Sequence, residues 1–258
     1  MTNNNKKPLI LVVNDDGIES KGIKMLSNAM REIGEVYVVA PDSNRSGASH
    51  AITLDKEIYI NNLNNGLNEY TCSGTPVDCV KLAINKILPR LPDLCVSGIN
   101  HGANHSINIL YSGTAHAAIE ASIKGVPSIA FSHLSYSQSA DLDQFKNVIL
   151  NLSMNIIKNK LPIGVTLNVN IPDLPINKIN GIRVSQQGDG KWVEDYKLKS
   201  SSKLLSYYWI TGHFEDKKHE EGCDLWDAKN NYISIVPIST NFTNNSSINI
   251  LKYLQYDF

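Results

Sequence analysis

Apolar residues along the first two thirds of the chain form two kinds of pattern. Continuous apolar runs bounded by turn residues predict strands buried on both faces, and apolar residues spaced near 3.6 predict amphipathic helices. Such runs predict strands at residues 9–13, 36–40, 93–97 and 128–132, and the alternating segment 165–171 predicts a further strand. The predicted helices span residues 23–33, 77–88, 114–124 and 142–156. Strands that alternate with helices in this way predict a doubly wound, mostly parallel α/β sheet.

The last third of the chain has a different pattern. Three short β segments are predicted there, at residues 182–185, 207–211 and 232–237, without a clear helical periodicity. All three tryptophans also lie in this part. We therefore divide the chain into an α/β region of residues 1–172 and a β-rich C-terminal extension of residues 173–258, within one structural domain. We expect the extension to reach across a partner subunit.

Charge and cysteine content narrow the possible partners and the compartment. The net charge of −1 and the lack of a long basic run do not favour a nucleic-acid polymer as partner. No stretch approaches the ~20 apolar residues that span a bilayer, and the start MTNNNKK is polar. The four cysteines lack CxxC spacing, and Cys79 and Cys95 lie in apolar segments, which favours buried thiols. These features predict a cytoplasmic protein without a membrane partner.

Polar loops that contain glycine follow three of the predicted strands. They are Asn14-Asp15-Asp16-Gly17, Pro41 to Gly47, and Gly98 to Asn104. Ligands of open α/β sheets bind beyond the carboxyl ends of the strands, so we expect these loops to open onto one edge.

Asp15 and Asp16 are the first candidates for chemistry. A turn that caps the following helix is the simpler interpretation of Asp-Asp-Gly. Two carboxylates at a buried strand end repel each other, however, and a hard cation would relieve that repulsion. Ser46 and Asn100 can add neutral oxygen ligands. Such an oxygen set suits Mg²⁺, Mn²⁺ or Ca²⁺ and argues against zinc.

The segment Ser112-Gly113-Thr114 opens the small-residue helix. It could be an ordinary helix cap, or its free N–H groups and hydroxyls could hold a phosphate at the positive end of the helix dipole. The segment Ser73 to Pro76 repeats the arrangement, with a proline near the first turn.

Several histidines are candidates for acid–base chemistry because histidine titrates near neutrality. None is flanked by an obvious nucleophile and acid, and His50 and His101 rank first because they are near the polar loops. The full set is His50, His101, His105, His116 and His133. The chain has no GxSxG, P-loop or GxGxxG motif, which weakens acyl hydrolase, NTPase and dehydrogenase interpretations.

Taken together, four stretches resemble the SurE family of metal-dependent nucleotidases (survival protein E). They are VNDDGIESKGI at residues 13–23, VVAPDSNRSGASHAITL at 38–54, SGTPVDCVKLA at 73–83 and SGINHGANHSINILYSGTAHAA at 97–118. Weaker similarity continues as LNVNIP, RVSQQG and YISIVPI, so the resemblance spans nearly the whole chain.

The resemblance implies a Rossmann-like fold whose C-terminal extension helps to form a homodimer or homotetramer. It implies hydrolysis of nucleoside 5′- and 3′-monophosphates with one Mg²⁺ or Mn²⁺ per subunit, and in some members release of phosphate from short polyphosphate. The family's metal ligands correspond to Asp15, Asp16, Ser46 and Asn100. Its substrate contacts correspond to Asn14, Asn104, Ser112, Gly113 and Thr114.

Two positions depart from the family pattern. Ser106 stands where a glycine is usual, and His116 replaces a small residue in the helix that follows Ser112-Gly113-Thr114. Loss of a glycine would strain the loop if that position needs a positive φ.

The mechanistic hypothesis gives Asp15 two roles, as a metal ligand and as the group that orients the attacking water or accepts its proton. Two alternatives stay open. One is a covalent phospho-aspartate route, which the adjacent Asp-Asp spacing disfavours because neighbouring side chains at a strand end point in different directions. The other is a nucleotide-binding or sensing protein whose metal site is structural.

Overall fold

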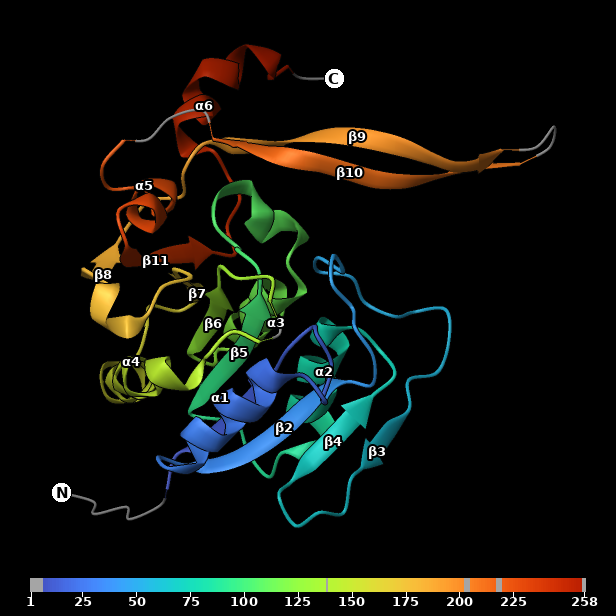
Figure 1. Ribbon diagram of the computed structural model, residues 1–258, viewed down its shortest axis with the longest axis vertical. Coiled ribbons are helices and arrows are strands. Elements are labelled where there is room, and N and C mark those ends of the chain that lie inside the picture. The colour runs from blue at the N-terminus through green and yellow to red at the C-terminus, as the bar shows by residue number, and fades with distance from the viewer. Residues whose placement is uncertain (1–6, 138, 202–204, 217–219, 257–258) are drawn as a thin grey trace.

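A nine-stranded sheet runs through the centre of the computed structural model, which describes residues 7–137, 139–201, 205–216 and 220–256 (Figure 1). Its strands, in spatial order, are β3 (Ile60–Asn62), β4 (Glu69–Cys72), β2 (Glu35–Pro41), β1 (Leu9–Val13), β5 (Leu94–His101), β6 (Ser128–His133), β7 (Val165–Ile171), β11 (Tyr232–Ser239) and β8 (Gly181–Val184). Neighbours from β4 to β7 pair in parallel, whereas β3 and β11 run antiparallel to β4 and β7. The predicted mostly parallel α/β sheet is confirmed.

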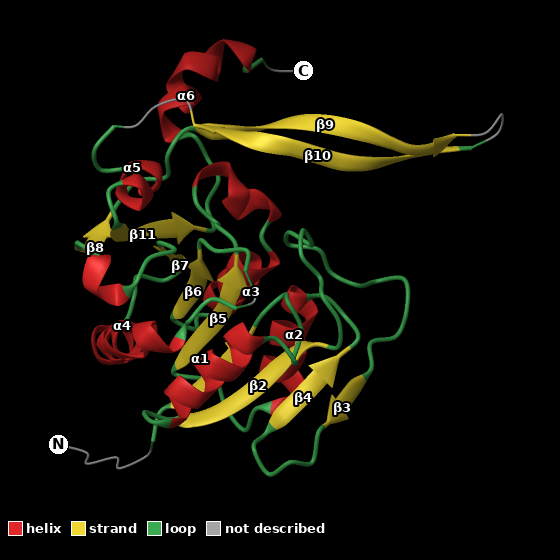
Figure 2. Ribbon diagram, in the orientation of Figure 1, coloured by secondary structure: helices red, strands yellow, loops and turns green. Residues whose placement is uncertain are grey.

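Helices cover both faces of this sheet (Figure 2). Helices α1 (Lys21–Arg31) and α4 (Lys146–Asn159) share one apolar core with the strands, and α2 (Pro76–Leu82) and α3 (Gly113–Ile123) share a second core on the other face. Helix α1 buries the apolar residues whose helical spacing predicted it. Its residues Ile23, Leu26 and Met30 are buried at the spacing that the sequence predicted, and Ser20 caps its start.

The order of the strands creates a switch point between β1 and β5. From β1 the chain crosses to β2 on one side of the sheet and later returns to β5 on the other side. The carboxyl ends of β1 and β5 therefore flank a crevice of the kind in which doubly wound proteins bind ligands.

The C-terminal third contributes to the central sheet and also projects from it. Strands β8 and β11 join the sheet, and β11 pairs with β7 over Val165 to Asn170. Strands β9 (Gly190–Ser201) and β10 (Ser206–Asp216) form a long antiparallel hairpin that extends away from the body (Figure 1). The predicted segment 207–211 is one part of this hairpin. The division of the chain at residue 172 stays a prediction.

Several elements were not predicted. They are the edge strand β3, its neighbour β4, the strand β9, and the helices α5 (Asp224–Lys229) and α6 (Asn245–Ile250). The C-terminal third thus contains two helices although its sequence shows no clear helical periodicity, because α5 and α6 are too short, at six residues each, to give one. Short 3₁₀ or π segments span Ala83–Ile87, Ser106–Tyr111, Asp143–Phe145, Ile176–Lys178 and Leu251–Leu254.

Two expectations from composition concern burial and membranes. Cys79 and Cys95 are buried and free, as predicted. Among the described residues, no helix combines the length and apolarity needed to span a membrane. The polar start of the chain, residues 1–6, lies outside the described residues.

Candidate active site

The turn after β1 places two carboxylates at the switch point. Gly17 has a φ of +96°, a conformation that favours glycine. Beneath the turn, the buried side-chain amide of Asn14 donates hydrogen bonds to Gly17 O and Ser20 Oγ, both at 2.9 Å. Asn14 therefore holds the turn that carries Asp15 and Asp16, and it lines neither of the cavities described below.

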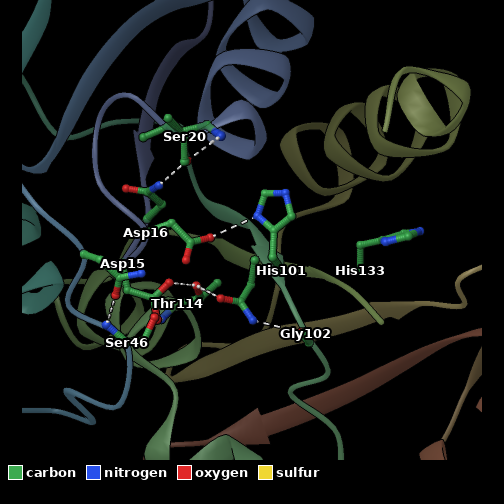
Figure 3. Close-up of polar contacts among 12 residues, drawn as sticks. Asp15, Asp16, Ser20, Ser46, His101, Gly102, Thr114 and His133 are labelled. Carbon is green, nitrogen blue, oxygen red and sulfur yellow. Dashed lines mark hydrogen bonds and ion pairs between the residues drawn. The ribbon is translucent and has the colours of Figure 1, made fainter. Parts of the chain in front are cut away.

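Asp15 is the most perturbed carboxyl group of the site. Its side chain is 3% exposed, and its carboxylate accepts hydrogen bonds from the backbone N–H of Thr114, at 3.0 Å, and from the Thr114 hydroxyl (Figure 3). Burial raises the pKa of Asp15 to about 6, with a further upward contribution from Asp16, although the Thr114 hydrogen bonds oppose the shift. The protein thus holds a carboxylate whose charge is incompletely compensated by its neighbours.

Helix α3 can approach Asp15 only because its first residue is glycine. A Cβ atom at Gly113 would lie 2.8 Å from the Asp15 Cβ, which is closer than real contacts allow. Ser112 caps the helix by accepting a hydrogen bond from Ala115 N at 3.0 Å. The predicted segment 112–114 therefore lies directly against the predicted metal ligand.

The Asp16 carboxylate contacts a histidine. Its Oδ2 lies 3.3 Å from His101 Nδ1 (Figure 3). His101 is the one histidine of the five candidates that contacts either carboxylate of the turn within the described structure. His50, the other histidine ranked first from the sequence, instead lies 3.0 Å from Glu120 on α3.

The loop after β2 is fastened over this turn. The backbone N–H of Arg45 donates to Asp15 O at 2.7 Å, which brings the neighbouring Ser46 to the crevice. Further along the loop, the Thr75 hydroxyl donates to Ala51 O at 2.7 Å. The His50 contact with Glu120, whose other oxygen lies 2.8 Å from Lys81 Nζ, ties the loop to α2 and α3.

The end of β5 carries Asn100, and the loop that follows carries Asn104. The Asn100 side-chain amide donates to Gly102 O at 2.8 Å, and its Oδ1 lies 3.5 Å from the Thr114 hydroxyl that binds Asp15. The side-chain amide of Asn104 donates to Ser132 Oγ at 2.8 Å. Asn100 thus shares a hydroxyl neighbour with Asp15.

Buried polar residues of β7 hold the backbone of Asn104. Asn170 Oδ1 accepts a hydrogen bond from Asn104 N at 2.9 Å, and the Asn168 side-chain amide donates to Asn104 O at 2.8 Å. Sequence reasoning missed these residues and Ser132. The signal was present, because two asparagines on a strand in the middle of a sheet must find buried partners.

Two adjoining cavities open at this edge of the sheet. The first has a volume of about 410 Å³ and contains Asp15, Ser46, Asn100, Asn104 and Ser112 among its lining residues. The second, of about 570 Å³, contains Asp16 and is more polar. Ser46, His101 and Tyr136 line both cavities. The predicted convergence of three strand-end loops is therefore observed.

The segment Ser73 to Pro76 is not an open anion site. Thr75 caps α2, and the Asp78 carboxylate folds back to accept the Thr75 N–H at 2.9 Å. It also accepts hydrogen bonds from Thr53. Because a carboxylate already occupies this helix start, the capping interpretation is correct here and the phosphate interpretation is wrong.

Comparison with known proteins agrees with this geometry. A family model described as Survival protein SurE matches residues 10–194. The chain belongs to the SurE family. A protein of Flavobacterium psychrophilum named 5′-nucleotidase SurE is 46% identical over 249 residues, which cover 95% of this chain and 97% of the relative. A protein of the same name from Christiangramia forsetii is 48% identical over 244 residues, or 93% of this chain and 94% of the relative.

A solved structure extends the similarity to three dimensions. The crystal structure of SurE protein from Aquifex aeolicus aligns with a TM-score of 0.84 at 37% identity, and the alignment covers 96% of this chain and 99% of that one. The whole architecture, including the C-terminal third, is therefore that of a SurE protein.

Ser106, where the resemblance led us to expect a glycine, does occupy a left-handed conformation, with a φ of 52°. Its N–H donates to Asp224 Oδ2 and its hydroxyl to Gly188 O, both at 2.8 Å. These bonds join the loop that carries Asn104 to the C-terminal third, and they offset the cost of the strained backbone. His116 is buried on α3 with its Nδ1 2.9 Å from Ser112 O, and burial lowers its pKa.

Proposed function

We propose that this SurE-family chain is a phosphomonoesterase that hydrolyses nucleoside 5′-monophosphates, and 3′-monophosphates as well, with one divalent cation per subunit. The relatives named 5′-nucleotidase SurE support the reaction class. The observation that carries the proposal is that Asp15, Ser46 and Asn100 line one cavity at the switch point of the sheet, while Asp16 and Ser46 line the adjoining one.

These four residues fit a hard cation by their chemistry. They offer two carboxylates, a hydroxyl and an amide oxygen, the ligands that Mg²⁺ and Mn²⁺ prefer, and Ca²⁺ is also compatible. The raised pKa of Asp15 fits as well, because a buried carboxylate beside Asp16 lacks a compensating charge. Within the described ranges, no group of three or more His, Cys, Asp or Glu side chains is arranged to hold a metal ion. In the proposed set, the Ser46 hydroxyl and the Asn100 amide oxygen would supply the remaining ligands. When bound, a cation would stabilise charge on the phosphoryl group and make water a better nucleophile.

The remaining roles fall on residues of the chain itself. Asn104, Ser112, Gly113 and Thr114 would position the phosphate, with Asn104 fixed in place by Ser132, Asn168 and Asn170. Asp15 would orient the attacking water and accept its proton at a carboxylate oxygen. Asn14 would act one step further away, by holding the turn on which Asp15 stands.

The hairpin supports a homodimer or homotetramer, which forms part of the proposal. Six large side chains of β9 and β10 are more than half exposed on a segment that projects from the body (Figure 1). They are Tyr196, Leu198, Tyr207, Tyr208, Trp209 and Ile210. Exposed apolar side chains gathered in this way are typical of protein interfaces. The cytoplasmic localisation expected from the sequence stays a prediction.

The test is phosphate release from a panel of nucleoside monophosphates, with short polyphosphate included, after EDTA treatment and after Mg²⁺ or Mn²⁺ is added back. We expect release only with the metal. Folded protein that releases no phosphate with any metal, yet binds nucleotides, would turn the proposal into the alternative of a binding protein.

A further inference from the structure

An aromatic side chain from the hairpin base lines the cavity that contains Asp15. Trp192, near the start of β9, borders this cavity together with Asn100 and Asn104. Its indole Nε1 donates a hydrogen bond to Asn108 Oδ1 at 2.7 Å. The Phe214 ring packs against it edge to face, with centroids 5.8 Å apart. The indole is therefore held in one orientation while part of it faces the cavity.

A second aromatic ring borders the same cavity from another element. Tyr136 follows β6, is 72% exposed and lines both cavities. Its ring lies over Gly102, where a Cβ atom would come within 2.5 Å of the Tyr136 Cε1. Gly102 also has a φ of +116°, so glycine is required here both by the backbone conformation and by the close approach of the Tyr136 ring.

Few charged groups line this cavity. Asp15 and His101 are the acidic and basic side chains among its lining residues, which include no Lys or Arg. Asn108, Tyr111, Tyr136 and Trp192 also line it and are uncharged polar or aromatic residues. A second phosphate would find no cation here, whereas a flat, uncharged group would find aromatic faces.

We propose that Trp192 and Tyr136 form the binding wall for the nucleobase of the substrate, with Trp192 as the rigid member. This inference rests on the proposed nucleotidase function and deepens it. Stacking is tolerant of the base because every base has a π-face. The wall should therefore favour nucleotides over base-free sugar phosphates, and larger purines over pyrimidines, rather than select one base.

The decisive experiment compares one variant on substrates with and without a base. Trp192→Leu should raise KM for AMP about tenfold, UMP less, and leave the kcat/KM for ribose 5-phosphate within about twofold. If ribose 5-phosphate is turned over too slowly, its Ki as a competitor of AMP replaces kcat/KM. Trp192→Phe, which keeps an aromatic face and loses the bond to Asn108, should lie between Trp192→Leu and the wild type.

Tyr136 has a matched control elsewhere on the surface. Tyr59 is 66% exposed and does not line either cavity. Tyr136→Leu should weaken AMP use severalfold, whereas Tyr59→Leu should leave it unchanged. Equal effects of these two substitutions would contradict a specific role for Tyr136.

A binding measurement keeps this inference separate from the proposed function. AMP should quench the tryptophan fluorescence of the wild type, ribose 5-phosphate should not, and Trp192→Leu should lose the quenching. If Trp192→Leu weakens AMP and ribose 5-phosphate equally, Trp192 has only a structural role and the inference is wrong, while the nucleotidase proposal stands. If the wild type releases no phosphate but the AMP-specific quenching persists, the nucleotidase proposal fails and the base wall is upheld.

Discussion

The same tripeptide, Ser-Gly-Thr, opens two helices of this protein and ends in two different environments. At Ser73-Gly74-Thr75 the threonine caps α2, and the helix start is closed by Asp78 from the same helix. At Ser112-Gly113-Thr114 the serine caps α3, and Thr114 is left to bind Asp15, which comes from β1, 99 residues away in the chain. The Ser-Gly-Thr sequence therefore supplies hydrogen-bond donors in both places. Whether these donors stabilise a helix start or belong to the candidate active site depends on which carboxylate accepts their hydrogen bonds.

The largest expected effect is on activity, at Asp15, the carboxylate bound by the second Ser-Gly-Thr segment. Asp15→Asn should reduce kcat/KM for AMP on the order of 10³-fold at saturating Mg²⁺, because the site loses a charged ligand and the water's proton acceptor. Phosphate release measures the loss, and circular dichroism shows whether the fold is kept. Activity near that of the wild type would remove Asp15 from the mechanism.

The raised pKa of Asp15 makes a prediction about stability. Between the ordinary value of 3.8 and about 6 the folded protein binds more protons than the unfolded chain, so this carboxyl is stabilising at low pH and its contribution is lost as pH rises. The metal-free protein should lose about 2 kcal/mol of unfolding free energy from this residue between pH 4 and pH 6. Urea unfolding in EDTA measures it.

The matched protein for that experiment is Asp15→Asn, whose unfolding free energy should fall less over the same pH range. Added Mg²⁺ should stabilise the wild type more at pH 7 than at pH 5, because the cation competes with the proton. Parallel pH curves for the two metal-free proteins would show that Asp15 is not the titrating group.

Asp78 should affect stability more than activity. Asp78→Asn weakens the hydrogen bonds to Thr75 N and to Thr53, and we expect a loss of about 2 kcal/mol in unfolding free energy. Activity of the folded variant should stay within a few-fold of the wild type. A large fall in kcat without loss of stability would mean that the first Ser-Gly-Thr segment also serves the reaction.

The smallest expected effects come from Thr114 and Thr75, the threonines of the two Ser-Gly-Thr segments. Thr114→Val removes the hydroxyl between Asp15 and Asn100, and should reduce kcat/KM about tenfold. Thr75→Val should cost about 1 kcal/mol in stability, because the helix loses its cap, and change kcat/KM little. Thermal unfolding and phosphate release on both variants test the pair, and a reversed order would refute the division of roles.

The sequence was most informative where a pattern is local. The apolar runs and helical spacings predicted the core of the fold, and the rule that ligands lie at strand ends brought together Asp15, Ser46 and Asn100. The sequence could not predict strands that are defined mainly by their pairing with neighbouring strands. The edge strand β3 and its neighbour β4 are short and Asn-rich or partly exposed, and β9 is a mostly exposed strand, so none carries a strong apolar signal.

Contacts across long sequence separations were equally hidden. The alternation in β7 predicted a strand with one polar face, yet Asn168 and Asn170 are buried and hold Asn104. The indole of Trp192 reaches the cavity only because the hairpin base packs against the 3₁₀ segment Ser106–Tyr111. Neither relation follows from spacing alone.

The position of β11 has a consequence for biosynthesis. This strand, residues Tyr232–Ser239, lies between β7 and β8 and is made after both of them. A chain emerging from the ribosome therefore carries β7 with one unpaired edge for more than sixty residues of synthesis, since β7 ends at Ile171 and β11 begins at Tyr232. A product truncated before Tyr232 would keep that open edge, the form of strand most prone to pair with other chains. Quality control of this protein thus depends on its last quarter, although the chemistry resides in its first half.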